Sequence, residues 1–281
     1  MTGQIEGRTN PARISAVDGL RGVLALVVVA WHATPNGPAW MLMLANLAVT
    51  LFFVVSGYVL ARGWNGRFGL FLARRLVRLW PVYALCLGAG YLIAGQPPVL
   101  SEFLWFPLIG ANTRPFIDPP VWSLFLEVWT MPFMLLIVWA GAGRIWRAGA
   151  VMGGLIAASH FVPQLGVGVL FVAGAYFSRS EFRNRLLESW PLQALGRISY
   201  SLYLSHWLVI ALAMRLMGPW GGAMALPAVL VVAAGLWWGV ERPSIAASRR
   251  LGRLLAAVSP ARWPGPRRPA APAPASAGPR P

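Results

Sequence analysis

The sequence predicts an all-α protein that crosses a membrane several times, a polytopic transmembrane helical bundle. Hydrophobic residues make up 57% of the 281-residue chain, and only 11% of its residues are charged. Soluble domains average about 25% charged residues, so this composition excludes an ordinary water-soluble globule. The mean hydropathy of +0.61 and the 15 tryptophans agree with a membrane protein, because aromatic rings anchor at membrane interfaces.

Eight apolar stretches supply the helices of this bundle. Two of them, 148–162 and 164–178, are shorter than the about 20 residues that a bilayer prefers, and we interpret them as a helical pair that turns near Pro163. A ninth apolar run, 103–110, is too short to span and predicts a re-entrant or interfacial segment. The predicted spans are 19–34, 42–61, 77–94, 122–142, 148–162, 164–178, 194–214 and 222–240.

The arginines predict the orientation of the bundle. The chain has no lysine, and 20 of its 24 arginines fall on one side if the N-terminus is cytoplasmic. The opposite loops hold only Arg114 and Arg215. Positive charge concentrates on the cytoplasmic side of membrane proteins, so both termini are predicted to be cytoplasmic. A ninth full span at 100–111 would reverse every later loop, and we reject it.

The remaining composition narrows the class of protein. The net charge of +16 is explained by this topology, so we expect no nucleic-acid partner. The absence of lysine, with abundant Ala, Gly and Pro, indicates a GC-rich bacterial genome. The single cysteine, Cys86, excludes an intrachain disulfide and is interpreted as a small packing residue. We divide the chain into a membrane domain, 1–243, and a cytoplasmic Arg/Pro/Ala-rich tail, 244–281, disordered from about Ser259.

Two polar residues interrupt the first predicted span. Arg21 and His32 are eleven residues apart, about three helical turns, so their side chains face the same way about 16 Å apart along the axis. Ionisable residues inside a membrane are costly and mark functional sites by default. With a cytoplasmic N-terminus, we expect Arg21 near the cytoplasmic face and His32 near the outer face.

Glu127, in the fourth predicted span, is expected at a depth similar to that of His32, about one turn below the outer face. A carboxylate beside an imidazole fixes its tautomer and raises its basicity, which suits a general base. Separate structural roles are also open: His32 reaching water at a helix end, and Glu127 pairing with some arginine. Arg21 likewise can pair with Asp18. One shared site accounts for all of them together, and we favour it.

Other polar residues fall on a loop and on the seventh span. Arg75 and Arg78 are one turn apart on one helix face, and two forked guanidinium groups suit phosphate. From that cluster alone, ordinary positive-inside charge is the simpler explanation. Ser199, Tyr203 and His206 form one stripe, which either lines a site or bonds a neighbouring helix.

Weaker signals complete the set. Ser56-Gly57 indicates close helix packing, or a serine that lines a cavity. Glu241-Arg242 is expected to end the last span with local charge pairing. The chain has no catalytic serine elbow, phosphate-binding loop or Cys/His cluster, and its three histidines are far apart, so no metal site is predicted.

Six segments, in order, resemble the membrane-bound acyltransferase family 3, the O-antigen and nodulation-factor acetylase type. Each segment is weak alone, but the order is specific and covers about residues 14–243. They are 18–22 (DGLRG) with His32 beyond, 51–58 (LFFVVSGY), 74–81 (RRLVRLWP), 122–127 (WSLFLE), 195–207 (LGRISYSLYLSHW) and 241–243 (ERP).

This resemblance implies an enzyme that moves an acyl group, often acetyl, from a cytoplasmic donor such as acetyl-CoA to a sugar hydroxyl on an exported glycan. It implies that His32 is the catalytic base and that Arg21 supports the donor. Arg75 and Arg78 would hold CoA phosphates, and Glu127 occupies the family's acidic position. Members usually have about ten spans, more than the eight predicted here. We assign catalysis to His32, Glu127 and Arg21, donor binding to Arg75, Arg78, Arg74 and Ser56, and acceptor binding to Tyr203, His206 and Trp122.

The chain is therefore predicted to be a multi-pass O-acyltransferase of the bacterial inner membrane that modifies cell-envelope polysaccharide by direct transfer. Acyl-CoA is the expected co-substrate and a carbohydrate the expected acceptor, with no metal. Three alternatives stay open. They are the same chemistry on a small glycosylated secondary metabolite, a proton-coupled transporter that uses His32, Glu127 and Arg21 as a relay, and a catalytically inactive assembly subunit. The sequence does not predict an oligomeric state.

Overall fold

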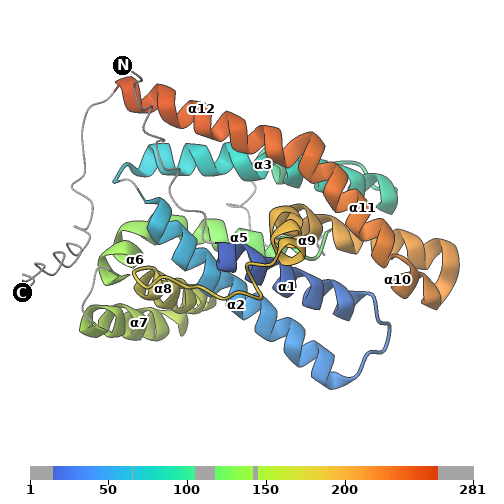
Figure 1. Ribbon diagram of the computed structural model, residues 1–281, viewed down its shortest axis with the longest axis horizontal. Helices are drawn as coiled ribbons and strands as arrows, with labels where there is room; N and C mark the ends of the chain where they lie inside the picture. The colour runs from blue at the N-terminus through green and yellow to red at the C-terminus, as the bar shows by residue number, and fades with distance from the viewer. Residues whose placement is uncertain (1–14, 65, 105–117, 142–144, 259–281) are drawn as a thin grey trace, which may run out of the picture.

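The computed structural model describes residues 15–64, 66–104, 118–141 and 145–258, and every regular element in these ranges is a helix (Figure 1). The predicted all-α class is confirmed. The helices are α1 (Ser15–His32), α2 (Ala39–Gly63), α3 (Phe68–Ala94), α4 (Leu100–Leu104), α5 (Val121–Trp129), α6 (Met134–Gly141), α7 (Ile145–Ser159), α8 (Gly168–Phe177), α9 (Trp190–Met217), α10 (Gly221–Met224), α11 (Leu226–Leu236) and α12 (Arg242–Val258).

Helices occupy all eight of the predicted spans. By length and composition, α2, α3 and the helical stretch Trp190–Met224 can each cross a membrane. Ile145–Ser159 and Pro163–Phe177 are shorter apolar helices, as predicted for the pair that turns near Pro163. In Figure 1, α6, α7 and α8 gather beside α2, and α12 lies along α3 on the opposite side of the molecule.

The fourth predicted span is not one continuous helix, contrary to the prediction. α5 ends at Trp129, a 3₁₀ turn follows at Met131–Phe133, and α6 then begins. Pro132 in this turn lacks an amide hydrogen, and its ring disfavours a continuous α-helix. The Thr130 hydroxyl donates to the Glu127 carbonyl oxygen at 2.7 Å, which satisfies one acceptor at the break. Glu127 therefore lies one turn before an interruption in the helix.

Two glycines set the packing of α1 against α9. A Cβ atom on Gly22 would lie 2.7 Å from the backbone nitrogen of Gly196, and a Cβ on Gly196 would collide with the Asp18 carbonyl oxygen. The two backbones therefore touch, which a larger residue at either position would prevent. The helices run side by side in the same direction, so residues ten positions beyond each glycine, His32 and His206, come together.

The last span continues past its predicted end. A π-helical turn, Trp237–Glu241, joins α11 to α12, and the chain remains helical to Val258. The Ser248 hydroxyl donates to the Arg74 carbonyl oxygen at 2.7 Å, which fixes α12 against α3. The last predicted span and the first part of the predicted tail are thus joined in one continuous helical stretch. The predicted disorder from Ser259 falls outside the described residues.

The segment after α3 folds back along that helix. The Trp80 indole donates to the Phe103 carbonyl oxygen at 2.8 Å, and the Tyr83 hydroxyl donates to the Glu102 carbonyl oxygen at 2.9 Å. Trp80 lies 14 residues before the end of α3, about 21 Å along its axis, so α4 returns towards the middle of the bundle. This supports the re-entrant interpretation for its first residues; 105–110 lie outside the described residues.

Candidate active site

Two cavities lie end to end between α1, α2, α5 and α9. The first, about 60 Å³, contains Arg21 and Glu127 in its wall and is called the Arg21 cavity. The second, about 210 Å³, contains His32 and is called the His32 cavity. Both have Val49 and Tyr203 in their walls, so these two side chains form the partition. The Arg21 cavity is also lined by Ser56, Ser123, Ser199 and Tyr200, and the His32 cavity by Trp31, Asn46, Pro119, Pro120 and Trp122.

One ring nitrogen of His32 is hydrogen-bonded to its own helix. Its Nδ1 lies 2.9 Å from the Val28 carbonyl oxygen. A carbonyl oxygen only accepts, so in the neutral ring Nδ1 carries the hydrogen and Nε2 carries the free lone pair. The ring packs in a T-shaped arrangement with Trp207, with centroids 5.4 Å apart, and against His206, with centroids 5.1 Å apart. These contacts hold the side chain at the wall of its cavity.

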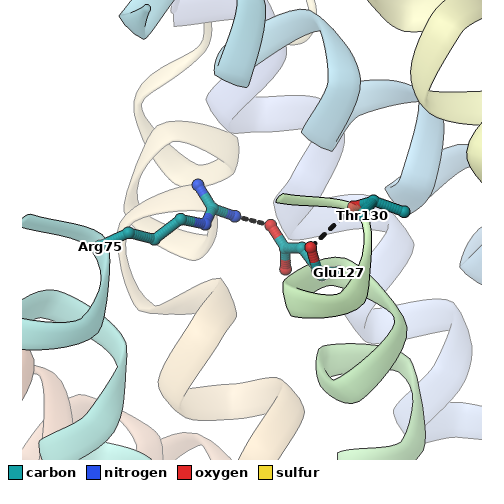
Figure 2. A network of polar contacts seen from close by, with 3 residues as sticks. All are labelled: Arg75, Glu127 and Thr130. Atoms are coloured by element: carbon teal, nitrogen blue, oxygen red, sulfur yellow. Dashed lines mark hydrogen bonds and ion pairs between the residues drawn. The ribbon is translucent and has the colours of Figure 1, made fainter. Parts of the chain in front are cut away.

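Glu127 does not orient His32, contrary to the prediction. Figure 2 shows Arg75 reaching from α3 to the Glu127 carboxylate, with which it forms an ion pair. Arg75 is seven residues from the start of α3, about 10 Å along the axis. Glu127 thus sits in the Arg21 cavity at the depth of Arg75, below His32. The backbone carbonyl of Val28, on the same helix as His32, replaces it as the orienting group.

His32 also lies deeper than expected. Its ring contacts His206, and α9 continues from His206 to Met217, about 16 Å at 1.5 Å per residue. His32 is therefore about midway along α9 and not at the outer end of the bundle. The separation of about 16 Å between Arg21 and His32 spans the inner half of the bundle in the predicted orientation.

The arginines on α3 divide between two sides of that helix. Arg78 has electrostatic contact with Arg21 and Glu241, and Arg75 with Arg21, so both arginines face the bundle interior as their spacing predicts. The buried Nε atoms of Arg74, Arg75 and Arg78 have no hydrogen-bond partner among the described residues. Arg74 instead faces α12, where a Cβ on Gly252 would lie 3.0 Å from its side chain.

The three predicted acceptor residues do not all line one cavity. Trp122 and Tyr203 line the His32 cavity, and the Tyr203 hydroxyl is 2.8 Å from the Ser123 hydroxyl at the partition. His206 lines neither cavity; it is 0% exposed and packs directly behind His32. Ser56 lines the Arg21 cavity, which agrees with the cavity-lining interpretation of Ser56-Gly57.

The sequence did not reveal the contacts of three polar residues, two of which, Glu241 and Asp118, are buried. Ser123 lies within the WSL segment but draws no attention without its Tyr203 partner. Glu241 is 1% exposed and accepts from the Ser201 hydroxyl at 2.7 Å, while Arg242 stacks over Trp238, so the expected local charge pairing does not form. Asp118 is 1% exposed, and its carboxylate has no hydrogen-bond partner in the described part of the chain. The π-helical turn that points Glu241 inward leaves no sequence signal.

Comparison with known proteins identifies the family of the chain. Residues 14–190 match the family model of an acyltransferase domain, and this range contains Arg21, His32, Arg75 and Glu127. The chain is 33% identical over 203 residues to "Protein 2 in picA locus" of Rhizobium radiobacter, an alignment that covers 59% of this chain and 97% of that protein. No solved structure matches the chain. Since the family model covers more than half of the sequence, the chain belongs to the acyltransferase 3 family of membrane acyltransferases.

Proposed function

We propose that this protein is an O-acyltransferase of the bacterial inner membrane. It moves an acyl group, acetyl in the simplest case, from cytoplasmic acyl-CoA to a hydroxyl of a sugar or glycan on the outer side. The observation that carries the proposal is the pair of cavities that meet at Tyr203, with a cation in one wall and a free imidazole nitrogen in the other. An acyl donor and an acceptor entering from opposite sides would meet at this partition.

The donor phosphates fit the arginines at the cytoplasmic end of α3. Arg75 and Arg78 present buried Nε–H donors that no described residue accepts. Buried donors left without acceptors cost about 1–3 kcal/mol each, and an anion that accepts from them recovers that cost. Planar guanidinium groups match phosphate oxygens with paired hydrogen bonds. Arg74 faces α12 and is left out of the proposed donor contacts.

The reaction requires one proton transfer and one displacement. Nε2 of His32 takes the proton of the acceptor hydroxyl, and the oxygen attacks the thioester carbonyl carbon. The carbon–sulfur bond breaks, and the departing thiolate takes up the proton to become the CoA thiol. A well-placed general base contributes typically about 10²–10⁴-fold to the rate.

We infer that the donor path must widen when acyl-CoA binds. A cavity of about 60 Å³ holds about two water molecules at about 30 Å³ each, so it is too small for a pantetheine arm. The proposal therefore requires movement at the partition, where the Ser123 and Tyr203 hydroxyls are hydrogen-bonded at 2.8 Å and are the proposed closing contact.

The proposal is tested with the full chain in lipid nanodiscs and radiolabelled acetyl-CoA. Wild type is expected to bind acetyl-CoA, and Arg75→Gln with Arg78→Gln is expected to weaken binding, whereas Arg215→Gln, on the predicted outer side, is expected to leave it unchanged. Incubation with lipid-linked glycan and with glycosylated small molecules identifies the acceptor by where the label appears. A wild-type protein that neither binds nor consumes acetyl-CoA or longer acyl-CoA donors contradicts the proposed function.

A further inference from the structure

One side chain with a hydroxyl group lies where the two cavities meet. Tyr203 lines both the Arg21 cavity and the His32 cavity. Arg21 and Ser56 line only the first of these cavities, and His32 lines only the second. Val49, which shares the partition, has an aliphatic side chain. Among the described residues, Tyr203 therefore supplies the polar group at the place where donor and acceptor would meet.

The hydrogen bonds at the partition assign the hydrogen of each hydroxyl. Ser123 donates to the Pro120 carbonyl oxygen at 3.1 Å, and a carbonyl oxygen only accepts, so the single hydrogen of Ser123 is used there. In the contact of 2.8 Å between the two hydroxyls, Tyr203 is then the donor and Ser123 the acceptor. If this contact opens, Ser123 keeps its own hydrogen bond and the hydrogen of Tyr203 becomes free.

Two other hydroxyls of the Arg21 cavity are bound to the main chain. Ser199 donates to the Gly196 carbonyl oxygen at 2.9 Å, and Tyr200 donates to the Leu79 carbonyl oxygen at 2.8 Å. Both acceptors belong to helices of the bundle, so these hydrogens stay where they are when the partition opens. Tyr203 differs from them because its acceptor is a side chain of the proposed closing contact.

The ring of Tyr203 is held independently of Ser123. It packs in a T-shaped arrangement with Phe52 on α2, with centroids 5.6 Å apart, and lies 5.8 Å from the ring of His206 on its own helix. A movement of α5, which carries Ser123, would break the hydrogen bond and leave the Tyr203 ring in place. The phenol hydrogen then turns about the carbon–oxygen bond towards a new acceptor.

We propose that Tyr203 is a catalytic residue whose hydroxyl, released from Ser123 as the donor enters, donates a hydrogen bond to the thioester carbonyl oxygen. This inference rests on the proposed acyl transfer and deepens it. When the acceptor oxygen attacks, the carbonyl oxygen becomes an oxyanion, and Tyr203 keeps its proton while its hydrogen bond stabilises that charge. The carbonyl double bond re-forms as the carbon–sulfur bond breaks, and the proton held by His32 leaves with the thiolate.

The rate of the transfer step tests this role separately from donor entry. Single-turnover transfer from radiolabelled acetyl-CoA at saturating concentration is measured with the full chain in lipid nanodiscs. Tyr203→Phe keeps the ring and removes the donor, so the transfer rate constant is expected to fall by about 10²–10³-fold, as for the loss of one oxyanion donor. Ser123→Ala leaves the Tyr203 hydrogen in place, so its rate constant is expected to equal or exceed that of wild type.

A matched tyrosine provides the control. Tyr58 donates to the Ser180 carbonyl oxygen at 3.0 Å and lines neither of the two cavities. Tyr58→Phe therefore removes a comparable hydrogen bond away from the site, and its transfer rate constant is expected to be unchanged.

The thioester carbonyl reports the same contact without turnover. Acetyl-CoA that is isotope-labelled at the carbonyl carbon is bound to each variant, and the carbonyl stretch is measured by infrared difference spectroscopy. A hydrogen bond weakens the carbonyl double bond, so the stretch is expected at lower frequency in wild type than in Tyr203→Phe. The same frequency in both proteins, or equal losses of transfer rate in folded Tyr203→Phe and Ser123→Ala, overturns the inference and leaves the proposed function standing. A wild type that neither binds nor consumes acyl-CoA overturns both.

Discussion

Among single residues, Arg75 and Glu127 form an ion pair between α3 and α5. Both side chains are mostly buried, 16% and 17% exposed, so removing one partner leaves a charge with little solvent. Breaking a buried pair costs about 3–5 kcal/mol, and the residual exposure reduces this. Glu127→Gln is therefore expected to lower the unfolding free energy by about 2–4 kcal/mol, measured by denaturation in detergent micelles.

The double variant Arg75→Gln with Glu127→Gln is the control. It removes both charges, so it should recover part of the lost stability. Arg62→Gln, an exposed arginine on α2, should change little. The loss of unfolding free energy in the double variant is compared with the losses in Arg75→Gln and Glu127→Gln. If it equals their sum, the two side chains do not interact favourably and the ion pair makes no net contribution to stability.

The Ser123–Tyr203 hydrogen bond gives a second prediction at this scale. Ser123→Ala and Tyr203→Phe each remove the same bond, worth about 0.5–1.5 kcal/mol, at the partition between the cavities. Both variants are expected to ease donor entry and to change the rate constant of acetyl-CoA association alike. Opposite effects in the two variants would rule out this bond as the closing contact.

Residue spacing predicted which side chains gather here but not which of them pair. Helical periodicity placed Arg21, Glu127 and Tyr203 on faces that do line the cavities. Which residue pairs with Glu127 depends on the depths of Glu127 and His32 in the bundle. The depth of Glu127 follows from the length of α5, and the depth of His32 follows from how far α9 continues beyond His206. Neither quantity can be read from apolar runs, because hydropathy does not locate a helix relative to its neighbours.

For single elements, the α1–α9 contact carries the most specific prediction. Gly22→Ala and Gly196→Ala place a methyl group against backbone atoms and should push the helices apart. Both are expected to reduce the yield of folded protein and to perturb the His32 resonances. Gly149→Ala is the matched control, because its methyl group would meet nothing within 4 Å and should stabilise α7 slightly, by about 0.5–1 kcal/mol. Normal yield and spectra for Gly22→Ala would refute this role.

The elements also show where sequence reasoning succeeds. Long apolar runs predicted helices at all eight spans because hydrophobic length is a direct membrane requirement. The break at Pro132 and the continuation through α12 were missed for opposite reasons. The break at Pro132 is a local interruption inside an apolar run. The helix α12 carries several arginines and is held by packing on α3.

For the whole molecule, the predicted orientation has a direct test. A reporter fused after Gln96 is expected outside, and one fused after Trp64 inside, because arginines concentrate on the side of the α2–α3 loop. Protease protection of the fused reporter in intact cells measures this. The same side for both reporters would contradict the spanning of α3 and, with it, the access of donor and acceptor from opposite sides.

The proposed role of His32 as general base predicts that the rate of acyl transfer depends on its side chain. Acyl transfer from radiolabelled acetyl-CoA, with the acceptor identified above, is compared for wild type, His32→Ala and His160→Ala in lipid nanodiscs. His32→Ala is expected to lower the transfer rate constant by about 10²–10⁴-fold with donor binding retained, while His160→Ala is unchanged. Full turnover by His32→Ala would contradict the claim.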